Sequence, residues 1–83
     1  MSLDRLQRAS KIAIGTKQTT KLVRNNKARA VFIAQDAEER ITKPVVNLCR
    51  EKNIDLIEVP HMAELGKACG IKVGAAMAAI VEK

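Results

Sequence analysis

The segment Ala30–Ala34 is a continuous apolar run, Ala-Val-Phe-Ile-Ala, within a chain of 83 residues. A strand with one face in water alternates polar and apolar residues, whereas an uninterrupted apolar run is typical of a strand that is covered on both faces. A chain of this length is long enough for one compact domain and too short for two. We therefore expect one domain, residues 1–83, built around this covered strand.

Helix and strand patterns alternate along the rest of the chain. Short apolar strands are predicted at residues 12–14, 54–59 and 75–81, besides the run at 30–34. Helices are predicted near Leu3 and Leu6, then over about 16–26, from the polar loop at 36–39 to about 52, and over 62–69. In the third helix, an i, i+4, i+7, i+8 spacing predicts an inward face made of Ile41, Val45, Leu48 and Cys49. This order favours a layered α/β sandwich.

Positive charge is concentrated in the first thirty residues. They hold eight Lys or Arg side chains against Asp4 alone, whereas the rest of the chain holds seven basic and eight acidic side chains. A one-sided positive charge favours a polyanionic partner, because neutralising phosphates releases their condensed counterions; a solvated basic surface is the alternative. With one Phe and no Trp or Tyr, the chain cannot build a platform of stacked aromatic rings.

Residues that could carry catalysis or bind a metal are few. Cys49 and Cys69 are far apart and His61 is the only histidine, so no close set of metal ligands is expected, and we interpret both cysteines as reduced core thiols. The glycines match neither the dinucleotide-binding nor the P-loop pattern. We expect no enzyme activity and no cofactor. Without a membrane-length apolar run or a signal-peptide pattern, we also expect a cytoplasmic protein that does not contact membranes.

The first candidate binding surface is Gly15-Thr16-Lys17-Gln18-Thr19-Thr20-Lys21, where a strand ends and a helix begins. Lys17, Lys21 and Arg24 are spaced i, i+4, i+7 and so share one exposed helix face. The free amides at the helix start suit a phosphate, lysine can donate to guanine O6 and N7, and the Gln18 amide can read a purine edge. A plain solvated helix face is the alternative.

The second candidate surface is the stretch from Leu65 to Gly74. Gly66 inside a helix costs roughly 1 kcal/mol relative to alanine, so we expect a close contact at that position. If the segment between the last two glycines is extended, Ile71 and Val73 lie on one side and Lys72 on the other. The two apolar side chains could then cap an unstacked base. Alternatively, both point into the core.

Three strings in this sequence together resemble the ribosomal protein L-seven-Ae family, and its small bacterial members most closely. They are Gly-Thr-Lys-Gln-Thr-Thr-Lys at 15–21, Val-Phe-Ile-Ala-Gln-Asp-Ala-Glu at 31–38 and Leu-Gly-Lys-Ala-Cys-Gly at 65–70. They occur in the family's order and spacing, and the resemblance extends from about Lys11 to Val81. It implies a three-layer α/β/α sandwich with a mixed four-stranded sheet that binds kink-turn RNA, a sharply bent duplex with tandem G·A pairs and a bulge.

The resemblance also implies which residues contact the RNA. The family's Asn-Glu and following Lys, which read the guanines, fall on Lys17, Gln18 and Lys21. Gly15 and Thr16 fall where the protein approaches the RNA backbone closely. Glu38 matches the acidic residue that touches a flipped base, and the loop that covers the bulge corresponds to Ile71, Lys72 and Val73.

The sequence departs from the family pattern where Asn-Glu is replaced by Lys17-Gln18. A glutamine carbonyl accepts a hydrogen bond more weakly than a carboxylate. The extra lysine could compensate, so we expect affinity for RNA to persist, whereas selectivity among RNA sequences does not follow from the resemblance. The leading hypothesis is a ribosomal or ribosome-associated kink-turn binder. The alternatives are a structural ribosomal protein without kink-turn selectivity and an RNA-binding subunit of an RNA-modifying enzyme. The expected partner is structured RNA, either ribosomal RNA or a riboswitch, and nothing in the sequence indicates an obligate dimer, so we expect a monomer.

Overall fold

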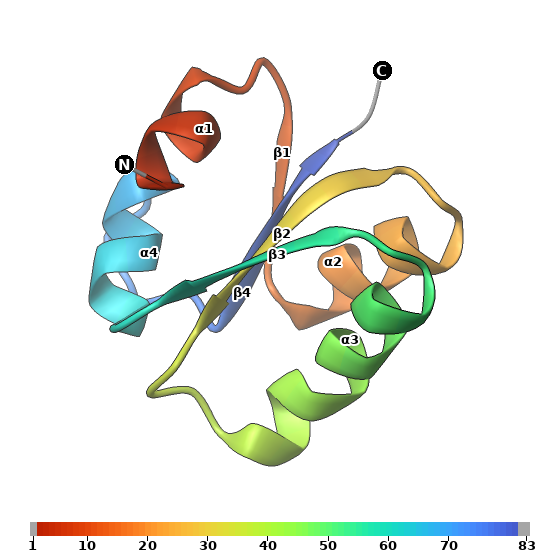
Figure 1. Ribbon diagram of the computed structural model, residues 1–83. Helices are drawn as coiled ribbons and strands as arrows, with labels where there is room; N and C mark the ends of the chain where they lie inside the picture. The colour runs from red at the N-terminus through yellow and green to blue at the C-terminus, as the bar shows by residue number, and fades with distance from the viewer. Residues whose placement is uncertain (1, 82–83) are drawn as a thin grey trace.

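The computed structural model describes residues 2–81, in which helices and strands alternate as the sequence patterns predicted (Figure 1). The helix bounds differ from the predicted ones by a few residues; the helix predicted over about 16–26, for instance, ends at Arg24, two residues early. None of the helices in this part of the chain is long and apolar enough to cross a membrane. In order, the elements are α1 (Ser2–Arg8), β1 (Ile12–Ile14), α2 (Thr16–Arg24), β2 (Ala28–Ala34), α3 (Glu39–Glu51), β3 (Asp55–Val59), α4 (Met62–Ala68) and β4 (Met77–Val81).

The four strands form one mixed sheet in the order β1-β4-β2-β3. Strand β4 lies between β1 and β2 and is antiparallel to both, whereas β2 and β3 are parallel. It follows that β1, β2 and β3 all run in one direction and β4 runs in the other. The mixed four-stranded sheet implied by the family resemblance is therefore confirmed.

Both faces of the sheet are covered by helices, which makes the fold a three-layer α/β/α sandwich (Figure 1). Along β2, Phe32 belongs to a core cluster with Leu6 of α1 and Leu65 of α4. Its neighbours on the strand point the other way, where Val31 packs in a second cluster with Val23 of α2 and with residues of α3. The continuous apolar run at Ala30–Ala34 is thus explained, because successive side chains enter different cores.

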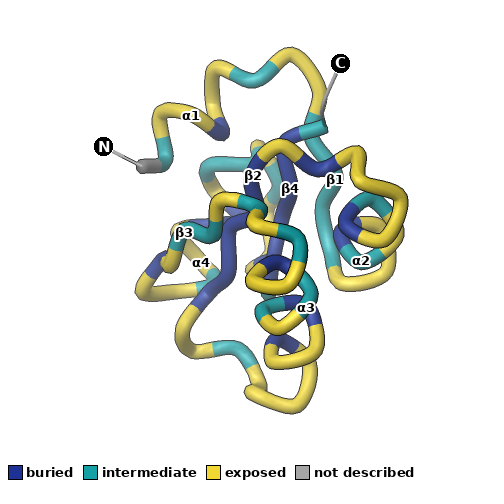
Figure 2. The backbone as a smooth tube through the Cα atoms, turned by 45° about the vertical axis from the view of Figure 1, so that its right-hand side comes forward, coloured by how far each residue is buried: buried dark blue, intermediate teal, exposed yellow. Residues whose placement is uncertain are grey.

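The inner face of α3 differs from the predicted one. Ile41 is 37% exposed and Leu48 is only partly buried, whereas Thr42, Val45 and Cys49 form the buried face. The prediction for Ile41 was wrong because the first turn of α3, which begins at Glu39, lies past the end of β2 (Figure 1). Figure 2 shows most of this turn coloured as exposed, and Thr42 is its buried residue.

The two cysteines are free thiols in the hydrophobic core or at its edge. Cys49 is buried, and Cys69 is half-buried against the cluster beneath α1 and α4. Burial raises the pKa of both thiols, because the thiolate would lose its hydration. Both therefore remain protonated at neutral pH and are poor nucleophiles, in keeping with the prediction of core thiols.

Candidate nucleic-acid interface

Four connections meet at one end of the sheet, which we call the loop end. Because β1, β2 and β3 are parallel to one another, the segments that follow them leave the sheet at the same end, and the antiparallel β4 enters it there. In Figure 1 these segments point toward the lower half of the view. The predicted RNA-binding residues, at 15–21, 38 and 71–73, all lie on these four connections.

Hydrogen bonds join these connections to one another. The Gly15 amide donates to the carbonyl of Met77 over 2.9 Å, which links the start of α2 to the start of β4. The Met62 amide donates to Asp36 Oδ1 over 2.8 Å, so the segment after β2 is attached to the start of α4. The Met62 carbonyl in turn accepts from the Ala75 amide over 3.1 Å. The loop end is therefore a connected surface whose parts are held in a fixed arrangement.

The start of α2 is open to an approaching ligand. Gly15 precedes the helix with φ 98° and ψ 164°, and a Cβ built on it would meet no atom within 4 Å. No side chain caps the first amides of this nine-residue helix, which also has no acidic residue in its first turn. Such amides, together with the positive end of the helix dipole, favour a negatively charged group.

Polar side chains surround these amides. Lys17, Gln18 and Lys21 are exposed, as the sequence predicted, and so is Thr16. The opposite side of the helix packs into the core through Thr19 and Val23. The arrangement thus presents two ammonium groups, a carboxamide and free backbone amides on the solvent side of α2. It is suited to contacts with phosphates and with the hydrogen-bonding edges of bases.

A side chain added at Gly15 should destabilise the protein through backbone strain alone. Its φ and ψ lie in a region that residues other than glycine rarely adopt. We expect Gly15→Ala to lower the free energy of unfolding by about 1–3 kcal/mol, measured by urea denaturation. Because the added methyl group would meet open space, the loss would report backbone strain. Unchanged stability would show that this turn tolerates another conformation.

The turn after α4 places the second candidate segment. Gly70, at φ 82°, ends the helix: its amide donates to the carbonyl of Lys67, and the Ile71 amide donates to the carbonyl of Gly66. These two hydrogen bonds, together with a glycine in the left-handed conformation, form the Schellman motif. It sends the chain back toward the loop end, where Ala75 is bonded to Met62.

The side chains of this segment are arranged differently from the predicted extended pattern. The backbone bends at Lys72 and Val73, so Ile71 and Val73 do not share one face. Ile71 is half-buried and packs against the core cluster of α1 and α4, as the residue after a Schellman turn commonly does. Val73 is 70% exposed, and Lys72 is also exposed. Only one of the two apolar side chains is therefore fully available to cap a base.

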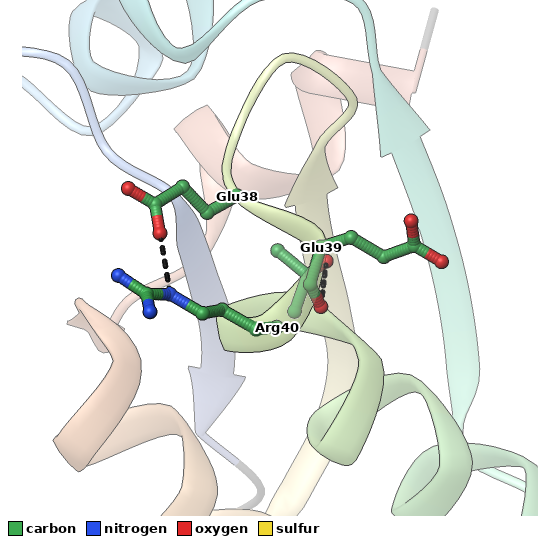
Figure 3. A network of polar contacts seen from close by, with 4 residues as sticks. Glu38, Glu39 and Arg40 are labelled. Atoms are coloured by element: carbon green, nitrogen blue, oxygen red, sulfur yellow. Dashed lines mark hydrogen bonds and ion pairs between the residues drawn. The ribbon is translucent and has the colours of Figure 1, made fainter.

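Glu38 lies exposed at the start of α3 and is not a free carboxylate. Its Oε2 accepts a hydrogen bond from Arg40 Nε over 2.8 Å, and Figure 3 shows both side chains pointing to the same side, away from Glu39. Both groups are mostly solvent-exposed, so the pair contributes little to stability. A ligand that engages Glu38 would therefore compete with Arg40 or be bound by both.

Sequence reasoning missed two participants in this surface. Arg40 pairs with the predicted site residue Glu38, two positions before it. The opposite charges at i and i+2 at a helix start could have indicated this pair. Asp36 anchors the start of α4 from 26 residues away, and no local pattern could have shown that contact.

Comparisons with known proteins agree with this fold. A family model described as the ribosomal protein L7Ae/L30e/S12e/Gadd45 family matches residues 2–83. An RNA-binding protein of Bacillus pumilus is 44% identical over 81 residues, covering 98% of this chain and 99% of that protein. An RNA-binding protein of Caldanaerobacter subterraneus is 49% identical over 71 residues, covering 86% and 87%. Among solved structures, the Giardia lamblia 15.5kD RNA binding protein superposes with a TM-score of 0.87 at 26% identity, covering 99% of this chain and 72% of that one.

Proposed function

Because this chain belongs to the ribosomal protein L7Ae/L30e/S12e/Gadd45 family, we propose that it binds RNA and recognises kink-turns through the loop end of its sheet. The observation that carries the proposal is the start of α2, where uncapped amides and exposed Lys17, Gln18 and Lys21 stand on the same end of the sheet as exposed Val73. A bent RNA presents a phosphate backbone, base edges and unstacked bases close together, and this surface offers a partner for each.

Each part of the surface has a distinct role in the proposal. The amides at Thr16 and Lys17 bind a backbone phosphate, and the missing side chain at Gly15 lets that phosphate approach closely. Lys17, Gln18 and Lys21 contact the edges of the paired guanines. The single aromatic ring of the chain, Phe32, is buried and cannot stack on an extruded base. Val73 therefore supplies the apolar cover, and Ile71 anchors its loop by packing against the core.

Gln18 sets the expected selectivity. A glutamine carbonyl accepts from the Watson–Crick edge of a guanine as a neutral group, and a hydrogen bond to a neutral acceptor is roughly half as strong as one to a carboxylate. The neighbouring lysines add contacts that depend mainly on phosphate charge. We therefore expect high affinity with a moderate preference for tandem G·A pairs. The partner in the cell is an RNA with such a bend, for example ribosomal RNA or a riboswitch.

A calorimetric titration tests the proposal. The protein is titrated with a kink-turn hairpin and with the same hairpin whose G·A pairs are changed to Watson–Crick pairs, both at 150 mM salt, close to physiological ionic strength. Phosphate contacts alone would bind both RNAs, so the difference between the two Kd values reports recognition of the bend. We expect the kink-turn to bind at least tenfold more tightly. Equal affinities would reject kink-turn recognition and favour a structural RNA-binding role.

Val73 provides a separate check on the apolar contact. Its side chain is 70% exposed in the free protein, so Val73→Ser should leave the melting temperature unchanged. We expect it to weaken the kink-turn complex about three- to tenfold, because covering a valine side chain is worth roughly 1.5 kcal/mol. Isothermal titration of the two proteins with the same hairpin measures the difference. If affinity is unaffected, the loop after α4 does not cover a base.

A further inference from the structure

Five of the eight basic residues in the first thirty positions form two groups at opposite ends of the sheet. Lys17 and Lys21 belong to the loop end. Arg5, Arg8 and Arg29 instead line a hollow of about 450 Å³ together with Ser10, Ile80 and Val81, which we call the arginine hollow. The proposed kink-turn interface uses none of these residues.

The arginine hollow lies far from the loop end. Arg29 is the second residue of β2 and Val81 is the last residue of β4, so both mark the end of the sheet where β2 starts. In Figure 1 the end of β4 and the connection from α1 to β1 lie at the top, opposite the loop end. Strand β2 has seven residues and so spans about 20 Å between the two ends. A single RNA bend held at α2 would not reach both sites with the same phosphates.

Among residues 2–81, the positive charge of the hollow is nearly uncompensated. No acidic side chain of the described residues lines it. Arg5 Nη1 lies 3.5 Å from Asp55 Oδ2, but the two side chains are 43% and 67% exposed, so this pair is screened by water. Neither Arg8 nor Arg29 has a carboxylate partner among residues 2–81. Three guanidinium groups around one concavity repel one another unless an anion lies between them.

The chemistry of the hollow points to phosphate. Guanidinium groups bind phosphate oxygens in pairs, with two parallel N–H donors. Ile80 is almost completely buried and lines the hollow, so one side of a bound anion would be shielded from water. Within residues 2–81, the large hydrophobic side chains that are exposed are Ile41 and Val73. Neither lines the hollow, which argues against insertion into a lipid surface.

We propose that the arginine hollow binds the phosphate backbone of a second RNA segment, so that the protein holds two RNA elements at opposite ends of its sheet. The proposal rests on RNA being the partner, as in the proposed function, but the two surfaces share no residue. The contact would be independent of sequence, because phosphate contacts fix position and carry no base information.

Two double variants test the hollow. Arg8→Gln with Arg29→Gln removes two of its charges, and Lys43→Gln with Arg50→Gln removes two exposed charges from α3 as a matched control. Each protein is first saturated with unlabelled kink-turn hairpin. A fluorescent, fully Watson–Crick RNA duplex is then titrated at several salt concentrations, and circular dichroism verifies the fold of each variant.

We expect the hollow variant to bind the duplex about tenfold more weakly than the control variant, with a salt slope that is smaller by about 2. The affinity of both double variants for the kink-turn hairpin should fall by no more than about threefold, which is the effect of net charge alone. If both double variants weaken the duplex equally, the effect is one of net charge and the proposal is wrong. It is equally wrong if neither variant weakens the duplex, as would happen if the hollow binds an acidic peptide instead.

The two proposals can fail separately. If the unmodified protein does not distinguish the kink-turn from its control but the hollow variant still loses duplex affinity relative to the α3 control, kink-turn recognition is rejected and the arginine hollow stands. If the hollow variant does not fold, Arg8→Lys with Arg29→Lys replaces it. That change keeps the charges but removes the paired donors, and we expect about threefold weaker duplex binding; unchanged binding would overturn the proposal.

Discussion

Replacing Lys17, Gln18 and Lys21 together by alanine is expected to abolish selective binding of a kink-turn hairpin and to leave the fold intact. All three side chains are exposed on α2, and within residues 2–81 none of them takes part in a hydrogen bond or salt bridge. A hydrogen bond to a charged group contributes about 1.5–3 kcal/mol. Loss of both lysine contacts should therefore weaken the complex more than a hundredfold, as measured by titration with the hairpin and its Watson–Crick control.

The matched control for this variant is a second exposed helix face. Lys43, Asn47 and Arg50 of α3 are exposed, at i, i+4, i+7, and carry two basic groups and a carboxamide like the proposed site. Their triple alanine replacement removes the same charge and should cost only the affinity due to net charge, about threefold or less. Full selectivity in the α2 variant, or equal losses in the two variants, would show that the start of α2 does not read the RNA.

Gly66→Ala is expected to destabilise the protein strongly, although alanine normally favours a helix by about 1 kcal/mol over glycine. A Cβ at this position would collide with the carbonyl oxygen of Val73 and would lie 3.2 Å from the Cα of Gly74. Backbone atoms cannot move away as a flexible side chain can. We expect a loss of about 2–3 kcal/mol, which lowers the melting temperature by on the order of 10 °C in a thermal unfolding measurement.

This substitution also connects stability to binding, because the atoms it displaces belong to the loop that carries Val73. We expect the variant to bind the kink-turn hairpin more weakly even at 15 °C, well below its lowered melting temperature. Lys67→Ala, at the neighbouring exposed position of α4, is the control and should change stability by less than about 0.5 kcal/mol. A Gly66→Ala protein as stable as the unmodified one would mean that α4 and the loop can separate without cost.

Local pattern was sufficient for most of the fold. The apolar run at Ala30–Ala34 indicated a strand covered on both faces, and the structure places its alternate side chains in two cores. Glycines at 15 and 70 marked the ends of a strand and a helix correctly, since both adopt positive φ. The exposed face of α2 followed from helical periodicity. These features depend on neighbours within a few residues, so sequence alone determined them.

Other features were decided only by tertiary structure. Which of Ile71 and Val73 is exposed depends on the bend after Gly70 and on the core that receives Ile71. The inward face of α3 shifted away from Ile41 because the first turn of the helix lies past the end of β2. The hydrogen bond from Met62 to Asp36 and the convergence of three arginines in one hollow join residues that are far apart along the chain. Periodicity states which way a side chain faces within its own element, whereas strand order and loop packing decide what it meets there.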